Sequence, residues 1–170
     1  MARCDLDYSC EDGIRCAVSE EEARHICEHV LEEENISRPC AVSMSVVSDL
    51  RIQEINLEWR NRDAATDVVS LECERPDDED LVAGEPCELG DRVLAPEYIG
   101  RQAKGYGTTA ADETRLLIVH AMLHLLGYDH IDDSEAEVME AREDELLRML
   151  KTDNTLTDVE LTRHVGEDMP

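Results

Sequence analysis

Residues 120–130, HAMLHLLGYDH, place three histidines in a segment whose other side chains are mostly apolar. His120 and His124 are four residues apart, so both lie on one face of a helix and can reach the same metal ion. Gly127 favours a left-handed end to that helix, and the chain reversal after it brings His130 back towards the first two. Three neutral imidazoles leave a fourth coordination position for water, which is typical of a catalytic metal site rather than a structural one.

The same spacing of histidines and glycine occurs in the zinc-peptidase pattern H-E-x-x-H-x-x-G-x-x-H. Those peptidases need a glutamate after the first histidine as general base. This chain has Ala121 at that position. The sequence therefore predicts a metal-dependent hydrolase without the peptidase base, and peptide hydrolysis becomes the minor alternative.

The segment around the histidines, LLIVHAMLHLL, is apolar on every side, which predicts a central buried helix that begins at Thr108 or Thr109. Amphipathic patterns predict four more helices, one of which follows a capping box formed by Ser19 and Glu22. A second is expected after an Asp49 cap, with apolar positions at Leu50, Ile52, Ile55 and Trp59. The other two are expected at residues 95–103 and 134–151.

Alternating apolar residues predict four short strands. They lie at residues 2–9, 40–48, 67–72 and 91–95. Strands alternating with helices predict one α+β domain with a small mixed four-stranded sheet packed against helices. This domain is expected to span residues 1–151, followed by a polar C-terminal tail at residues 152–170.

The composition limits the kinds of partner. The 170 residues contain 42 acidic and 16 basic side chains, a formal net charge of −26, which repels polyanions at long range and argues against a surface that coats DNA or RNA. An RNA contact would have to be local and strongly anchored. The seven cysteines include no C-x-x-C pair, which fits reduced thiols in a cytosolic protein better than a disulfide framework. The acidic, polar stretch at residues 1–13 is not expected to act as a signal peptide, and no apolar run approaches the ~18 residues that predict a membrane-spanning helix.

The motif resembles that of the YbeY-type endoribonucleases, the metal-dependent rRNA maturation factors, whose signature is close to H-G-x-L-H-L-x-G-Y-D-H. The likeness extends to INLEWRNRDAATDVVSLE at residues 55–72, to LGD at 89–91 and to SEAEVMEAREDELL at 134–147. Ala121 replaces the usual glycine and Leu71 the usual phenylalanine. Together these stretches cover roughly residues 40 to 150.

This resemblance implies a cytoplasmic enzyme that binds one metal ion, usually zinc, through His120, His124 and His130. It implies cleavage of single-stranded RNA, with 16S rRNA 3′-end maturation and ribosome quality control as cellular roles. The expected partners are rRNA and the small ribosomal subunit, without membrane or DNA. The sequence leaves the oligomeric state open.

The resemblance also places the family's arginine at Arg60, whose planar guanidinium can hold a phosphate with two hydrogen bonds. Asp129 can either accept a hydrogen bond from an imidazole or only shape the turn. Glu143 falls on the inward face of its helix, where its charge needs a histidine or an arginine as partner. The general base stays unassigned, since either an activated water or the 2′-hydroxyl of the RNA can attack.

Two rival interpretations remain. The first is a metal-dependent hydrolase of another substrate, including a peptide. The second is a non-catalytic ribosome-assembly factor in which the metal holds the fold. Substitution of His124 would unfold the domain under the second interpretation, whereas a catalytic site would lose activity with its fold largely intact.

Overall fold

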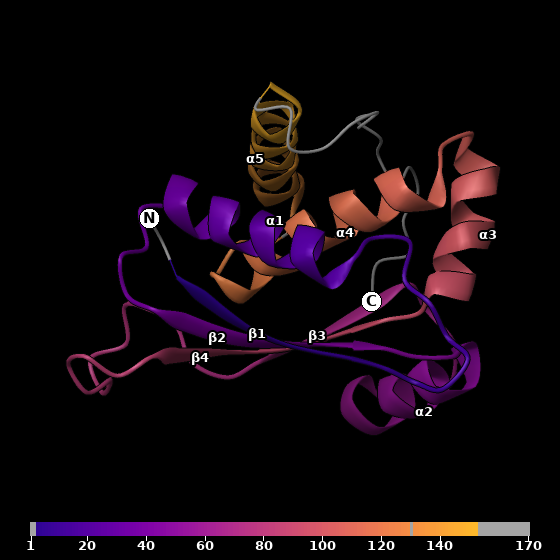
Figure 1. The fold of residues 1–170 in the computed structure, drawn as a ribbon, viewed down its shortest axis with the longest axis horizontal. Coiled ribbons are helices and arrows are strands. Elements are labelled where there is room, and N and C mark those ends of the chain that lie inside the picture. Colours follow the sequence, from indigo (N-terminus) through magenta and orange to yellow (C-terminus); the bar gives the residue numbers. More distant parts are fainter. Residues whose placement is uncertain (1–2, 130, 153–170) are drawn as a thin grey trace.

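The computed structural model describes residues 3–129 and 131–152, which form a mixed four-stranded sheet and five helices (Figure 1). The strands are β1 (Cys4–Cys10), β2 (Cys40–Val46), β3 (Val68–Glu72) and β4 (Cys87–Leu94). The helices are α1 (Glu20–Glu33), α2 (Asp49–Arg60), α3 (Pro96–Tyr106), α4 (Ala110–Leu125) and α5 (Asp133–Thr152). The strand order is β1-β2-β4-β3, with β1, β2 and β4 parallel and β3 antiparallel to β4. The predicted α+β fold is confirmed. Of the predicted C-terminal tail at residues 152–170, Thr152 ends α5, and residues 153–170 lie outside the described residues.

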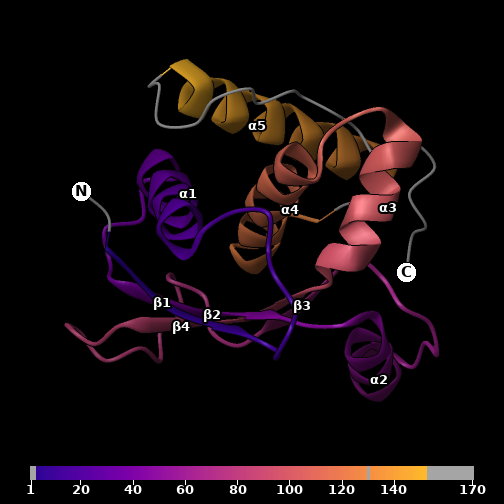
Figure 2. The same ribbon diagram turned by 45° about the vertical axis from the view of Figure 1, so that its right-hand side comes forward.

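The sheet separates two unequal groups of helices. Figures 1 and 2 show α1 and α4 on one face, with α5 stacked on them, whereas α2 lies on the opposite face. Edge strand β3 contacts α4 on one side and α2 on the other. The centre of the molecule is therefore the layer between α4 and the sheet.

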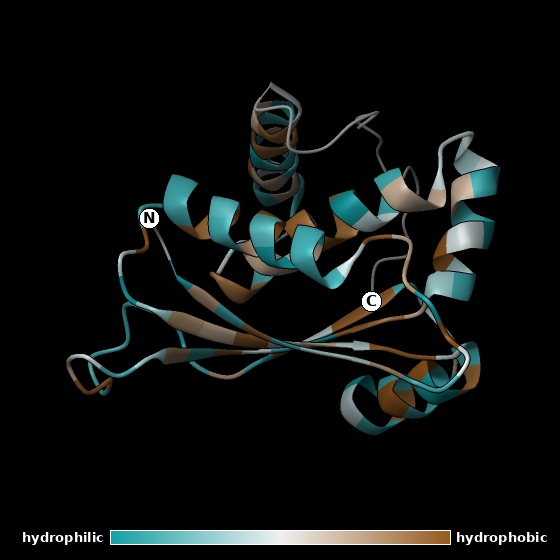
Figure 3. Ribbon diagram, viewed as in Figure 1, coloured by the Kyte–Doolittle hydropathy of each residue, from teal (hydrophilic) through white to brown (hydrophobic). Residues whose placement is uncertain are grey.

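Local sequence explains why the larger group of helices forms. On β2 the alternate residues Cys40, Val42, Met44 and Val46 are buried beneath the helices. Helix α1 begins at Ser19, whose hydroxyl accepts the backbone N–H of Glu22, as the capping box predicts. In Figure 3 the outer surface of α1 is hydrophilic and the strands beneath it carry apolar segments.

Helix α4 is the buried helix that the sequence predicts. Thr109 is its N-cap, with its hydroxyl accepting the N–H of Asp112 at 3.1 Å. The apolar residues of α4 pack against α1, α3, α5 and the sheet; they include Leu117, Ile118, Val119, Met122, Leu123 and Leu125, all at most 1% exposed. Because α4 is enclosed on nearly every side, the histidines near its C-terminal end are held in a rigid frame.

Helix α2 differs from its prediction in two respects. Its N-cap is Ser48 rather than Asp49, because the Ser48 hydroxyl accepts the N–H of Arg51. Ile52 and Ile55 are buried in a small second core, but Leu50 is 69% and Trp59 is 62% exposed. Among the described residues, α2 packs against β3 and the end of β4, and this narrow surface leaves the outer apolar residues of α2 largely exposed.

The main core contains a fully buried arginine, Arg92, on β4. Its Nη2 donates to the sulfur of Cys27 at 3.1 Å, whereas Nε and Nη1 have no hydrogen-bond partner among the described residues. A hydrogen bond from Cys4 and the charge of Arg92 together outweigh burial and lower the pKa of Cys27 to about 6. The guanidinium of Arg92 keeps its proton, so its charge favours the thiolate form of Cys27, which would serve as a counter-charge for the buried arginine.

Within the residues that the structure describes, no helix is both long and apolar enough to cross a membrane.

Candidate metal centre

His120 and His124 lie on the last two turns of α4, one turn apart, with their imidazole rings stacked. The ring centroids are 6.4 Å apart and the ring planes differ by 9°. The side chain of His120 is 20% exposed, and His124 is also partly accessible. The two rings therefore lie on the same side of the helix, nearly parallel to each other, as the four-residue spacing predicts.

A fixed acceptor holds Nδ1 of each ring. Nδ1 of His120 lies 2.5 Å from a carboxylate oxygen of Glu143, on α5, and Nδ1 of His124 lies 3.0 Å from the backbone carbonyl of Tyr128. A carbonyl can only accept, so Nδ1 of His124 carries the proton and its lone pair is on Nε2. The carboxylate favours the same tautomer for His120.

These contacts fit a metal ion. Histidines that bind metals through Nε2 usually donate Nδ1–H to a carboxylate or a backbone carbonyl, which orients the ring and raises its basicity. Both kinds of acceptor are present here. Within residues 3–129 and 131–152 no three side chains of ligand type converge on one point. The predicted third ligand, His130, lies outside these described residues.

Burial is the main influence on the charge of His124. It lowers the pKa of His124, and the neighbouring His120 lowers it further, while Glu72, the Tyr128 carbonyl and Asp129 act in the opposite direction. A lowered pKa keeps the imidazole neutral at pH 7, which is the form that binds metals. Asp129 is thus near enough to act on His124 electrostatically.

The chain turns at Gly127, directly after α4. Gly127 has φ of 113°, a backbone conformation that residues with side chains rarely adopt. Its N–H donates to the carbonyl of His124, and the N–H of Tyr128 donates to that of Leu123. The glycine therefore permits the turn that places the Tyr128 carbonyl against Nδ1 of His124.

Two residues beside the centre were missed by the sequence analysis, Glu72 and Arg75. Glu72 ends β3, and Arg75 follows in the next loop with its Nη2 donating to Glu72 at 3.1 Å. A Cβ at Gly127 would lie 2.9 Å from Nη1 of Arg75, so the guanidinium rests against the turn after α4. The antiparallel course of β3 brings its end towards the end of α4, but the sequence alone gave no sign of that pairing.

Arg60 belongs to a different helix from the two histidines. It is the last residue of α2, which packs on the opposite face of the sheet from α4 (Figures 1 and 2). Among the described residues, no hydrogen bond or ion pair joins Arg60 to either histidine. The role predicted for Arg60 stays a prediction.

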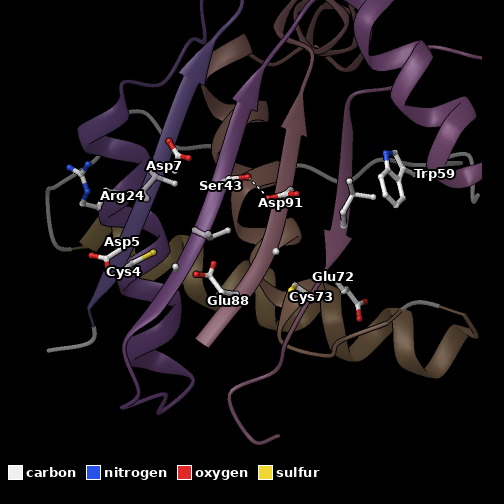
Figure 4. Close-up of a pocket in the computed structure, with 15 residues that line it drawn as sticks. Cys4, Asp5, Asp7, Arg24, Ser43, Trp59, Glu72, Cys73, Glu88 and Asp91 are labelled. Carbon is white, nitrogen blue, oxygen red and sulfur yellow. Dashed lines mark hydrogen bonds between the residues drawn. The ribbon is translucent and has the colours of Figure 1, made fainter. Parts of the chain in front are cut away.

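A concave surface lies on the sheet face turned away from α4. This open hollow of about 910 Å³ is bordered by Trp59 and lined by carboxylates from three strands, which include Asp5, Asp7 and Asp91 (Figure 4). Asp91 accepts a hydrogen bond from Ser43 across the hollow. The carboxylates that line this hollow disfavour a polyanion there.

Comparison with known proteins adds a family to this geometry. The sequence model described as Endoribonuclease YbeY matches residues 8–151. Curated proteins named Endoribonuclease YbeY are similar over most of their length. That of Francisella philomiragia is 43% identical over 123 residues, which cover 71% of this chain and 75% of the relative. That of an Exiguobacterium species is 38% identical over 126 residues, or 72% of this chain and 80% of the relative.

A solved structure has the same fold. The solution structure of TM1509 from Thermotoga maritima aligns with a TM-score of 0.53, covering 91% of this chain and 99% of its own. Its sequence identity is 19%, so this likeness concerns the arrangement of helices and strands alone.

Proposed function

Since the chain belongs to the Endoribonuclease YbeY family, we propose that it is a metal-dependent endoribonuclease that cleaves single-stranded RNA in rRNA processing. The observation that carries the proposal is the pair of imidazoles on α4, each oriented through Nδ1. In the cell the enzyme matures the 3′ end of 16S rRNA and takes part in ribosome quality control, which places it in the cytoplasm.

The ligands of this proposal are His120, His124 and His130. Three imidazoles suit Zn²⁺, which would supply a Lewis acid for the phosphoryl oxygen and would lower the pKa of a water molecule when bound there. Glu143 and the Tyr128 carbonyl hold two of the rings in the binding tautomer. Asp129 supports the same centre through its charge near His124.

Cleavage of a phosphodiester also requires positive charge near the transition state. Arg60 is our candidate for part of that charge. Helices α2 and α4 pack on opposite sides of edge strand β3, so an RNA strand that crosses this edge can meet both Arg60 and the histidines. Ala121 is buried and has no ionisable group, which leaves the attacking group as either water or the RNA 2′-hydroxyl.

The net charge of −26 sets the terms of RNA binding. Long-range repulsion opposes capture of arbitrary RNA, so the small ribosomal subunit supplies most of the affinity. Tight, salt-sensitive binding of the isolated protein to unrelated RNA would contradict this part of the proposal.

The decisive experiment is cleavage of a single-stranded fragment from the 3′ end of 16S rRNA by metal-loaded protein, with and without chelator. We expect cleavage that the chelator abolishes. Arg60→Ala should reduce cleavage while metal content and thermal unfolding stay unchanged, and Arg51→Ala on the same helix is the matched control. If the fully metallated wild type leaves the fragment and the small subunit intact, the proposal is wrong.

The rival is a non-catalytic assembly factor with a structural metal. His124→Ala separates the two, because α4 is packed on nearly every side by protein and should keep its fold without a metal. We expect loss of cleavage with a largely unchanged unfolding transition. Unfolding of the variant, or of chelated wild type, would favour the assembly factor.

A further inference from the structure

Arg75 brings a positive charge to the turn that follows the histidine helix. Its Nη1 would lie 2.9 Å and its Cζ 3.4 Å from a Cβ at Gly127, which is three residues after His124. The guanidinium therefore occupies the space that a side chain at position 127 would fill. No sequence pattern singled out this arginine, and the proposed mechanism does not use it.

Several contacts fix the orientation of Arg75. Its backbone N–H donates to the carboxylate of Asp78 at 3.0 Å, and its carbonyl accepts the N–H of Asp78. Its Nη2 donates to Glu72 at 3.1 Å. The backbone contacts order the loop at Arg75, and the ion pair with Glu72 orients its guanidinium, which reduces the entropy lost on binding.

The contact with Glu72 uses only part of the hydrogen-bonding capacity of the guanidinium. Arginine has five N–H donors in a planar fork, and the ion pair with Glu72 is made through Nη2. The Arg75 side chain is 44% exposed, so much of it faces solvent beside the candidate metal centre. A planar fork of this kind matches two oxygens of a phosphate.

We propose that Arg75 binds a phosphate of the RNA strand next to the one that is cleaved. This inference rests on the proposed function and adds a substrate-positioning residue to it. Contacts to phosphates fix the register of a nucleic-acid strand, so one oriented cation beside the centre both positions the strand and adds local affinity in a strongly acidic protein.

A purely structural role is the alternative. Arg75 could serve only to pair with Glu72 and to cover Gly127. Exposed ion pairs of this type contribute little to stability, about 0–1 kcal/mol. Substitution of Arg75 distinguishes the two roles. If the role is structural, the unfolding transition changes; if Arg75 binds a phosphate, KM and its salt dependence change.

The test compares Arg75→Gln with wild type in steady-state cleavage of a short single-stranded RNA at several salt concentrations. We expect KM to rise about tenfold, as for loss of a hydrogen bond to a charged group, with kcat nearly unchanged. The plot of log(1/KM) against log salt should become shallower by about 0.7, the value for one phosphate contact on a single strand. Arg75→Lys, which keeps the charge without the fork, should lie between the two.

Arg51→Gln is the matched control, because Arg51 also forms an exposed ion pair with a glutamate three residues away, Glu54, at 3.1 Å. It should leave KM within about twofold of wild type, as expected for a surface pair. If Arg75→Gln behaves like this control while wild type cleaves RNA, the inference is wrong and the proposed function stands. A larger drop in Tm for Arg75→Gln than for Arg51→Gln would assign a structural role and also overturn it. If wild type cleaves no RNA in any salt, both proposals fail.

Discussion

The carboxylate of Glu143 lies 2.5 Å from Nδ1 of His120, so the C-terminal helix α5 reaches the candidate metal centre on α4. Glu143 is only 4% exposed and sits among the apolar residues that pack α5 against α4. A buried carboxylate is costly without a partner. Its pairing with an imidazole explains both why the charge is tolerated and how the ring is oriented.

Glu143→Gln should weaken metal binding about 10- to 100-fold, the usual effect of removing a group that orients a ligand. The amide keeps the shape of the side chain but lacks the charge that favours the Nδ1–H tautomer. Competition with a chromogenic chelator measures the affinity. Glu137→Gln, an exposed position on α5, should leave it unchanged; equal affinity in both variants would show that Glu143 does not support the centre.

Gly127→Ala should destabilise the protein by about 1–3 kcal/mol, because the residue has positive φ and a methyl group would displace Arg75. Arg75→Ala alone should cost less than about 1 kcal/mol, as for other exposed ion pairs. Urea unfolding of both variants and the double variant forms a double-mutant cycle. In the double variant, the part of the destabilisation by Gly127→Ala that comes from the clash with Arg75 should disappear, whereas the part that comes from the positive φ should remain. Strict additivity would mean that the two residues do not touch.

Truncation of two nearby apolar residues of α2 should change the free energy of unfolding by very different amounts. Ile52 is fully buried, so Ile52→Ala should cost about 2–5 kcal/mol. Leu50 is 69% exposed, and Leu50→Ala should stay within about 0.5 kcal/mol of wild type. Similar losses in urea unfolding would place Leu50 in an interface with another surface.

Cys27 should make stability depend on pH in a window where carboxylates do not titrate. Its pKa is about 6 in the folded protein and about 8.5 in an unfolded chain. Because the pKa of Cys27 is lower in the folded protein, ionisation of Cys27 contributes fully to the free energy of unfolding when the pH is above the pKa of the unfolded chain. This contribution is lost as the pH falls through about 6. Cys27→Ser cannot ionise, so it should lose about 3 kcal/mol at pH 8.5 by leaving Arg92 without a counter-charge.

Unfolding by urea under reducing conditions, at pH values from about 6 to 8.5, checks this expectation. The difference in unfolding free energy between wild type and Cys27→Ser should shrink as the pH falls, which separates Cys27 from the histidines present in both proteins. Ultraviolet absorbance of the thiolate gives an independent titration. A constant difference across the range would mean that Cys27 is a neutral thiol.

Local patterns were sufficient for much of the fold. The alternation in β2, the caps of α1 and α4, and the apolar surface of α4 are all set by residues close in sequence, and each was predicted. Leu50 and Trp59 fall at apolar positions of α2 and yet are largely exposed, because periodicity cannot show how much sheet is available for a helix to cover.

In the candidate centre too, features set by nearby residues could be predicted, and features set by tertiary contacts could not. The spacing of His120 and His124 is a property of one helix and could be read directly from the sequence. The positions of Arg75 against Gly127 and of Arg92 against Cys27 depend on strand order and register, which join residues 52 and 65 positions apart. Only the folded chain brings such pairs together.

The thiolate of Cys27 has a kinetic consequence. A thiolate attacks alkylating reagents much faster than a thiol does, yet Cys27, a buried residue of α1, has 0% exposure. Its alkylation must therefore wait until α1 lifts from the sheet, a local opening with its own free energy. Once the more exposed cysteines have been blocked, the alkylation rate of Cys27 reports how often α1 opens. This one cysteine therefore measures the detachment of the first helix.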